Sequence, residues 1–195
     1  KNESIMTDKT LTFDEEVRLT RRQVASVEYR ALLIWGWTTI AIALAIFALM
    51  LTVPDGKWQL LWLALPVIAG TLHVKFQKPA LPAPTSLYLM LSSVSRMVIG
   101  VIFVCAVAGC YFTYPSYFIV ILVLAMWCGV SAFMLDYSRL KGPCVGGFAM
   151  AAAILNVSGP TTVAVFMAGV IATLVVPGYI MRSDARKEQT TACAR

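Results

Sequence analysis

An uninterrupted apolar run, Ala31–Val53, constrains this sequence more than any other feature, because its 23 residues include no charged side chain. At about 1.5 Å per residue, a helix of this length crosses the roughly 30 Å hydrocarbon core of a bilayer. Similar apolar runs recur along the chain. Only 13% of the 195 residues are charged, whereas a typical soluble domain has about 25%. The sequence therefore predicts an all-α protein, a polytopic bundle of transmembrane helices.

Six segments are predicted to cross the membrane. In chain order they are Ala31–Val53, Trp58–Val74, Met97–Tyr114, Tyr117–Leu135, Cys144–Val157 (with Gly142–Pro160 as its widest extent) and Thr161–Met181. The last span is expected to end at Pro177-Gly178-Tyr179. The membrane domain is therefore predicted to occupy residues 31–181.

Proline and arginine determine two details of these spans. Pro66 lies in the middle of the second span, where its missing N–H is expected to kink the helix or to free a carbonyl. The stretch Leu87–Tyr114 is too long for one simple span, so we divide it into an interfacial start, Leu87–Ser95, and a span that begins at Met97. This division leaves Arg96 at the cytoplasmic boundary.

Residues 1–30 are predicted to form a cytoplasmic segment that contains one amphipathic helix, Thr12–Arg30. Thr12 and Glu15 have the spacing of a capping box, and apolar residues follow at helical spacing. Four acids and four arginines balance within this helix, which argues against a polybasic lipid clamp. The helix is expected to lie on the membrane or on the protein's own cytoplasmic face, with a docking or dimerisation role as the alternative.

Lysine and arginine are distributed unevenly over the predicted topology. With six spans, 15 of the 16 Lys and Arg residues fall in the N-terminal segment, the inner loops and a basic tail at residues 182–195, and Lys57 alone is outside. The positive-inside rule then predicts both termini in the cytoplasm. Anionic headgroups at the span ends explain the net charge of +6, and no basic run with interleaved aromatics indicates a nucleic-acid partner. The expected partners are the lipid bilayer and either a second copy, as a homo-oligomer, or a cytoplasmic protein.

Arg96, His73 and Asn156 are the candidate ligand-binding residues, because polar groups within spans are costly to bury in lipid. Arg96 is interpreted first as a snorkelling anchor at the interface and second as a ligand for an anion. His73 ends the second span close to Lys75, which favours an interfacial role over a proton relay. Asn156 is near the outer end of the fifth span, where an interhelical hydrogen bond or an end cap is the first interpretation.

No predicted span contains an aspartate or a glutamate, and the chain has no H-E-x-x-H, G-x-S-x-G or Walker motif. Proton-coupled carriers and intramembrane metalloproteases usually need buried carboxylates or paired histidines. The sequence therefore predicts no catalytic residue, no metal site, no cofactor and no enzymatic activity. The five cysteines lie in apolar segments or the tail without a C-x-x-C pair, so no disulfide is expected.

Small residues at four-residue spacing predict faces where helices approach closely. Gly142 and Gly146 form a G-x-x-x-G motif, and Ala164, Ala168 and Ala172 share one face of the last span. These faces are expected to pack within the monomer, with oligomerisation as the second interpretation.

Three short motifs stand out along the chain. A charged amphipathic helix leads into Leu33-Ile34-Trp35-Gly36-Trp37, a Gly146-Gly147 pair opens the fifth span, and the chain leaves the membrane through Pro177-Gly178-Tyr179-Ile180-Met181-Arg182. With these motifs the chain resembles an uncharacterised family of small polytopic inner-membrane proteins from Bacteroidetes-type bacteria. The resemblance covers nearly the full length. It implies a helical membrane fold in a bacterial inner membrane, and it implies no activity.

Two functions from different classes follow from the sequence. The first is a non-enzymatic membrane protein with a structural, regulatory or interaction role, using the N-terminal helix and the basic tail as cytoplasmic contacts. The second is a small-solute transporter or channel that uses Arg96, His73 and Asn156. A central polar cavity would favour transport, whereas a tightly packed, dry bundle would favour the interaction role.

Overall fold

The computed structural model describes residues 12–53, 58–76, 84–111 and 116–193, and within these ranges the chain forms helices and no strand. The elements are α1 (Phe13–Thr52), the 3-10 helix η1 (Trp58–Leu63), α2 (Ala64–Phe76), α3 (Ser86–Tyr111), α4 (Ser116–Met134), α5 (Ser138–Ile154), α6 (Pro160–Val170), the π-helical turn η2 (Ile171–Val175) and α7 (Val176–Cys193). The prediction of an all-α protein is confirmed. Among the helices in these ranges, four stretches are long and apolar enough to cross a membrane: Phe13–Thr52, Ser86–Cys105, Ser116–Met134 and Pro160–Lys187.

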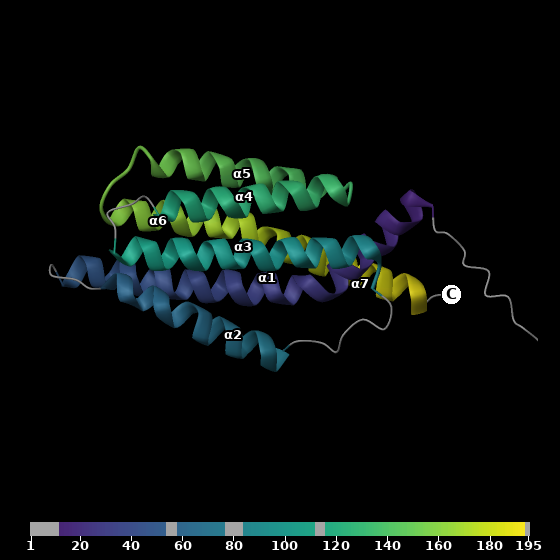
Figure 1. Cartoon of the computed structure of the whole chain (residues 1–195), viewed down its shortest axis with the longest axis horizontal. Coiled ribbons are helices and arrows are strands. Elements are labelled where there is room, and N and C mark those ends of the chain that lie inside the picture. The colour runs from purple at the N-terminus through teal and green to yellow at the C-terminus, as the bar shows by residue number, and fades with distance from the viewer. Residues whose placement is uncertain (1–11, 54–57, 77–83, 112–115, 194–195) are drawn as a thin grey trace, which may run out of the picture.

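The helices form one elongated bundle in which successive segments run in opposite directions (Figure 1). The segments in order are α1, η1 with α2, α3, α4, α5, and the continuous α6–η2–α7. Figure 1 shows that α1 begins and α7 ends at the same end of the bundle, which we call the terminal end. Helix α1 ends and α6 begins at the other end, called here the opposite end.

Helix α1 is one continuous helix of 40 residues, about 60 Å long. It begins at the predicted capping box, where the Thr12 N–H donates to Glu15 Oε2 at 3.2 Å. The sequence analysis expected an amphipathic helix that ended before a separate span, but the structure has no break near Arg30. The physical reason is that no glycine or proline occurs between Phe13 and Trp35, so nothing stops the helix from continuing.

The second segment changes helix type just before Pro66. A 3-10 helix, Trp58–Leu63, precedes α2, and Pro66 lies in the first turn of α2. The first N–H groups of an α-helix have no partner within the helix, so a proline costs little at this position. The helix disturbance predicted near Pro66 therefore coincides with the change from 3-10 to α-helix that precedes this proline.

Helix α3 is also unbroken and extends over 26 residues. The expected division between Leu87–Ser95 and a span from Met97 does not occur, because the segment contains no proline and continues in helical geometry. Arg96 consequently lies about 15 Å along the helix from Ser86. This placement moves the guanidinium from the end of a helix to the side of one.

The last helix passes through Pro177 and Gly178, where the sequence analysis expected an end. A π-helical turn, Ile171–Val175, precedes the proline, and the Val176 N–H donates to the carbonyl of Ile171, five residues back. The wider turn accommodates the pyrrolidine ring and the missing N–H, so the helix continues to Cys193. By contrast, α4 closely matches the predicted fourth span, and α5 begins six residues before Cys144.

Glycines mark the closest helix contacts. A Cβ at Gly147 would lie 2.4 Å from Thr173 Cγ2, and one at Gly169 would lie 2.9 Å from Ile121 Cδ1. The predicted packing residues make looser contacts: a Cβ at Gly146 would lie 3.6 Å from Ala172, and one at Gly142 would meet nothing within 4 Å. Ala164 is half-buried and Ala168 is exposed. The tight contacts therefore involve glycines that the G-x-x-x-G motif does not include.

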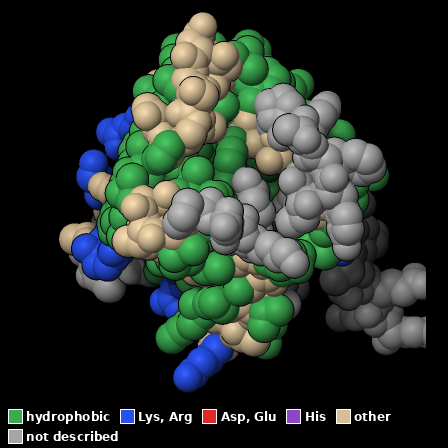
Figure 2. Space-filling view, turned by 90° about the vertical axis from the view of Figure 1, so that its left-hand side faces the viewer, with side chains coloured by type: hydrophobic (Ala, Val, Ile, Leu, Met, Phe, Trp, Pro, Cys, Tyr) green, Lys and Arg blue, Asp and Glu red, His purple; other side chains and the backbone are tan. Residues whose placement is uncertain are grey.

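Every charged side chain within the described residues lies in the half of the bundle nearer the terminal end. These residues occupy the first half of α1, the end of α2, the first part of α3, the α4–α5 turn with the start of α5, and the last part of α7. Figure 2 looks onto the opposite end, where the described surface is mainly hydrophobic and Lys and Arg appear only toward the margins. The bundle is therefore strongly asymmetric in charge along its long axis.

Candidate ligand-binding groove

A groove separates α2 from α3. Helix α2 packs against α1 but makes at most marginal contact with α3. A cavity of about 440 Å³ lies between α1, α2 and α3, with residues of α4, α6 and η2 at its base. This volume is within the usual range for small-molecule sites, roughly 300–1,000 Å³. We call this cavity the groove.

Helical spacing explains which side chains reach the groove. On α3 most of the lining residues recur three or four positions apart: Tyr88, Ser92, Ser95, Arg96, Ile99, Ile102, Phe103 and Val107, with Val98 beside them. On α1, Glu28, Ala31, Trp35 and Thr39 follow the same spacing, with Val27, Arg30, Leu32 and Ile34 beside them. Residues with this spacing share one helix face. Each helix thus presents one continuous stripe to the groove, polar toward the terminal end and apolar beyond it.

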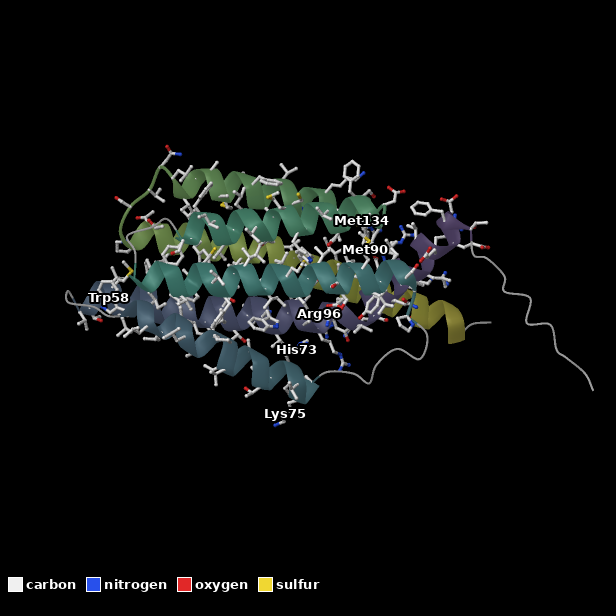
Figure 3. The ribbon with its side chains drawn as sticks, in the orientation of Figure 1. Trp58, His73, Lys75, Met90, Arg96 and Met134 are labelled. Atoms are coloured by element: carbon white, nitrogen blue, oxygen red, sulfur yellow. The ribbon has the colours of Figure 1, made fainter. Side chains whose placement is uncertain are left out.

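The polar part includes Arg30, Ser92 and Ser95 and four further residues, Glu28, His73, Tyr88 and Arg96, which we call the polar mouth. Tyr88 Oη donates to Glu28 Oε1 at 3.2 Å, and His73 lines the same groove from α2. Figure 3 shows Arg96 on α3 and His73 on α2, the two helices that border the groove. Three helices thus contribute ionisable groups to one small region.

The apolar part ends at three aromatic rings contributed by η1, α4 and α6. The ring centroids of Trp62 and Phe166 are 5.5 Å apart, and those of Tyr117 and Phe166 are 4.9 Å apart. Trp62 Nε1 donates to Tyr117 Oη at 3.2 Å, which satisfies the indole N–H in apolar surroundings. Phe166 is buried. This cluster closes the groove toward the opposite end of the bundle.

Hydrogen bonds from the N-terminal half of α1 hold the start of α3. Glu16 accepts a hydrogen bond from Ser86 Oγ and one from the Leu87 N–H at 3.2 Å. Thr20 Oγ1 lies 2.6 Å from Thr85 Oγ1, and Gln23 Oε1 accepts from the Thr85 N–H at 3.1 Å. A carboxylate at a helix N-terminus satisfies unpaired N–H groups and interacts favourably with the helix dipole. These contacts fix the α1–α3 side of the groove.

A second polar cluster joins the α4–α5 turn to α7. Tyr137, which is buried, donates to Asp184, and Arg139 pairs with the same carboxylate at 2.7 Å. Burial, together with the neighbouring Asp184 carboxylate, raises the pKa of the Tyr137 phenol, so the hydroxyl remains a donor at physiological pH. Arg21 of α1 lies over the Tyr137 ring, 5.8 Å from its centroid. This cluster closes the terminal end and does not reach the groove.

The structure brings together two of the three sequence-predicted ligand residues. Arg96 and His73 both line the groove. Asn156 follows α5 at the opposite end, where its Nδ2 donates to the Ala152 carbonyl at 3.1 Å. This hydrogen bond caps the end of α5, which is one of the two roles first expected for Asn156.

Glu28 and Tyr88 also belong to this site, although neither was among the residues predicted from the sequence. Glu28 was assigned to the cytoplasmic segment because α1 was expected to end before the first span. Its signal was present, since Glu28, Ala31 and Trp35 recur at the three- and four-residue spacing of one helix face. Within the described residues no group of three or more His, Cys, Asp or Glu side chains is arranged to hold a metal ion. The polar mouth contains two residues of these types, Glu28 and His73.

No protein-family model, curated protein or solved structure matches the chain. The fold and the groove thus define its class: a helical bundle with four helices apolar and long enough to cross a membrane, and one graded cavity along its side.

Proposed function

We propose that the chain is a multi-pass integral membrane protein without catalytic activity that binds a small amphiphilic solute, one apolar chain with a polar head, in the groove. In this proposal six segments cross the membrane and both termini face the cytoplasm. The resemblance noted above supports a bacterial inner membrane as its location. Binding of a solute agrees with the transporter hypothesis better than with a structural role. We therefore place the transporter hypothesis ahead of the structural one.

The charge distribution supports the topology. The described basic residues lie toward the terminal end, and the positive-inside rule assigns such an end to the cytoplasm. Two of the six segments are short: η1 with α2 covers 19 residues and α5 covers 17. At about 1.5 Å per residue, α5 is roughly 25 Å long, a mismatch that local thinning of the bilayer accommodates at modest cost.

The single observation that carries the binding role is the polarity gradient of the groove. Ionisable groups gather at one end, and an aromatic cluster closes the other. A neutral polar solute would leave the apolar wall without a partner, and a pure hydrocarbon would leave the ionisable groups without one. An amphiphile matches both ends. The groove is not the central polar cavity that would favour transport of a polar solute, since it lies beside α2 and α3 and most of its lining is apolar. A cavity of about 440 Å³ also differs from the tightly packed, dry bundle that would favour a purely structural role, and its mixed lining suits an amphiphile.

A matched pair of tryptophan substitutions on α3 tests the proposal. Ile102 lines the groove, whereas Val104 is 65% exposed on another side of the same helix and does not line it. Radiolabelled dodecanol would be titrated onto the full chain in lipid nanodiscs. We expect saturable binding to the wild type and to Val104→Trp, with loss of binding in Ile102→Trp.

Two results would overturn the proposal. One is the absence of saturable binding to the wild type. The other is unchanged binding in Ile102→Trp. Thermal unfolding of each variant reports whether it is folded, and Ile99→Trp repeats the blockade at a second lining position, 48% exposed, if the first variant is unstable.

A further inference from the structure

We infer that the polar mouth recognises an anionic headgroup, a carboxylate or a phosphate, on a single-chain membrane amphiphile. This inference rests on the proposed function and names the ligand class of the same groove. Arg96 would contact the anion directly, and the hydroxyl groups of Ser92 and Ser95 would add hydrogen bonds.

The balance of charge in the groove favours an anion. Two guanidinium groups, Arg30 and Arg96, line it against one carboxylate, Glu28, and the neutral form of the His73 imidazole would add a further hydrogen-bond donor. Glu28 already accepts a hydrogen bond from Tyr88. The remaining positive charge is therefore available to an incoming ligand, and its attraction for an anion is stronger in apolar surroundings than in water.

Arg96 is the residue best placed to grip the head. Its side chain is exposed within the groove, and in the described part of the chain its guanidinium has no hydrogen-bond or ion-pair partner. Arg30, in contrast, donates from Nε to Tyr29 Oη at 3.0 Å and stacks on that ring. A planar guanidinium binds carboxylate or phosphate oxygens with two parallel hydrogen bonds, which an ammonium cannot reproduce.

Hydroxyl groups next to Arg96 complete a donor set. Ser92 precedes Arg96 by four residues and therefore shares its helix face, and Ser95 also lines the groove. Ser95 Oγ accepts a hydrogen bond from Trp127 Nε1 at 2.9 Å. Since that bond uses the oxygen as acceptor, the Ser95 hydrogen can be donated to a ligand.

The dimensions favour one alkyl chain. From Arg96 to Val107 the groove follows α3 over 11 residues, about 16 Å, which suits an extended chain of roughly a dozen carbons. Its volume of about 440 Å³ is toward the lower end of the range for small-molecule sites. A single-chain amphiphile therefore fits the groove better than a lipid with two chains. The head would lie toward the terminal end and the tail toward Trp62 and Phe166.

The test compares ligands that share one chain and differ in the head. Dodecanoate, dodecyl phosphate, dodecanol and dodecyltrimethylammonium would be titrated onto the full chain in nanodiscs of zwitterionic lipid. We expect the two anions to bind at least about tenfold more tightly than dodecanol, as charge-assisted hydrogen bonds imply. Arg96→Gln should abolish this preference, and Arg96→Lys should retain only a small part of it.

Arg186→Gln provides the matched control, because Arg186 is an exposed arginine of the same bundle half that does not line the groove. This variant should keep the wild-type preference. Butyrate and inorganic phosphate provide the remaining arms, since they carry the anion without the chain. We expect neither to bind at concentrations that saturate dodecanoate.

The outcomes separate the inference from the proposed function. If dodecanol binds as tightly as the anions, or the ammonium binds best, the groove remains a binding site and the anion inference falls. If the short anions bind as well as the long ones, the ligand is a free anion and the amphiphile inference falls. If no dodecyl compound binds, the proposed function falls as well. An anion preference that survives Arg96→Gln contradicts the role assigned to this residue.

Discussion

Replacing Gly147 by alanine tests a close helix contact, the one at which an added Cβ would have the shortest distance to a neighbour among the described glycines. The new Cβ would lie 2.4 Å from Thr173 Cγ2 and 2.9 Å from Ala125 Cβ. Neither neighbour moves easily. Thr173 is fully buried and its hydroxyl donates to the Gly169 carbonyl at 2.8 Å, so turning its methyl group away would break that hydrogen bond. Ala125 Cβ is attached directly to the backbone of α4, so only a shift of the helix relieves the second contact.

The expected cost follows from two opposing effects. Overpacking of a close contact costs about 1–3 kcal/mol, whereas alanine is favoured over glycine within a helix by up to about 1 kcal/mol. We therefore expect Gly147→Ala to lower the free energy of unfolding by about 1–2 kcal/mol. For a chain of this size, that change corresponds to a fall in melting temperature of about 2–8 °C.

Gly146→Ala is the matched control, one residue away on the same helix. Its Cβ would lie 3.6 Å from Ala172 Cβ, an ordinary contact, so the helix preference should dominate and stability should stay equal or rise by up to about 1 kcal/mol. Thermal unfolding of purified protein in one mild detergent compares the two variants. Equal melting temperatures for Gly146→Ala and Gly147→Ala would refute the packing of α5 against α4 and η2.

Three further predictions concern the terminal end, the cysteines and the topology. Asp184→Ala should lower the free energy of unfolding by about 1–2 kcal/mol, because the buried Tyr137 hydroxyl loses its charged acceptor. Arg139→Ala should lower it by at most about 1 kcal/mol, since the Arg139 side chain is 58% exposed. Equal losses in thermal unfolding would contradict this difference. N-ethylmaleimide should modify the half-buried Cys105 well before Cys128, which is 2% exposed, and equal rates measured by mass spectrometry would count against the described burial. Reporter fusions should give a cytoplasmic signal at positions 80, 140 and 190 and a periplasmic signal at positions 56, 115 and 159, so a periplasmic signal at 190 would refute the six-span topology.

The apolar runs of the sequence predict the helical class and several element positions well. The charge-free run from Ala31 and the segment that forms α4 both appear as helices where they were expected. Helix ends were harder to predict, because an end depends on a local stop signal and on what surrounds it. No residue near Arg30 stops α1, and the π-helical turn before Pro177 cancels the stop signal that a proline normally gives.

The groove could not be predicted from the sequence, because it depends on the separation of α2 from α3. No local pattern encodes that separation, which results from how both helices pack on α1. Arg96 and His73 were identified because ionisable residues stand out among apolar ones. Glu28 did not stand out, since the segment before Ala31 is rich in charge and any one carboxylate there resembles a solvated residue.

Photo-labelling with a dodecanoate that carries a diazirine near the end of its chain tests the central claim most directly. The claim is that an amphiphile occupies the groove with its tail toward the aromatic cluster. After irradiation of the full chain in nanodiscs, peptide mass spectrometry identifies the labelled residues. We expect labelling at Ile102, Phe103 and Trp62, competed by unlabelled dodecanoate and absent in Ile102→Trp. The claim would be contradicted if unlabelled dodecanoate did not reduce the labelling and if the outward-facing Val101 and Val104 were labelled equally.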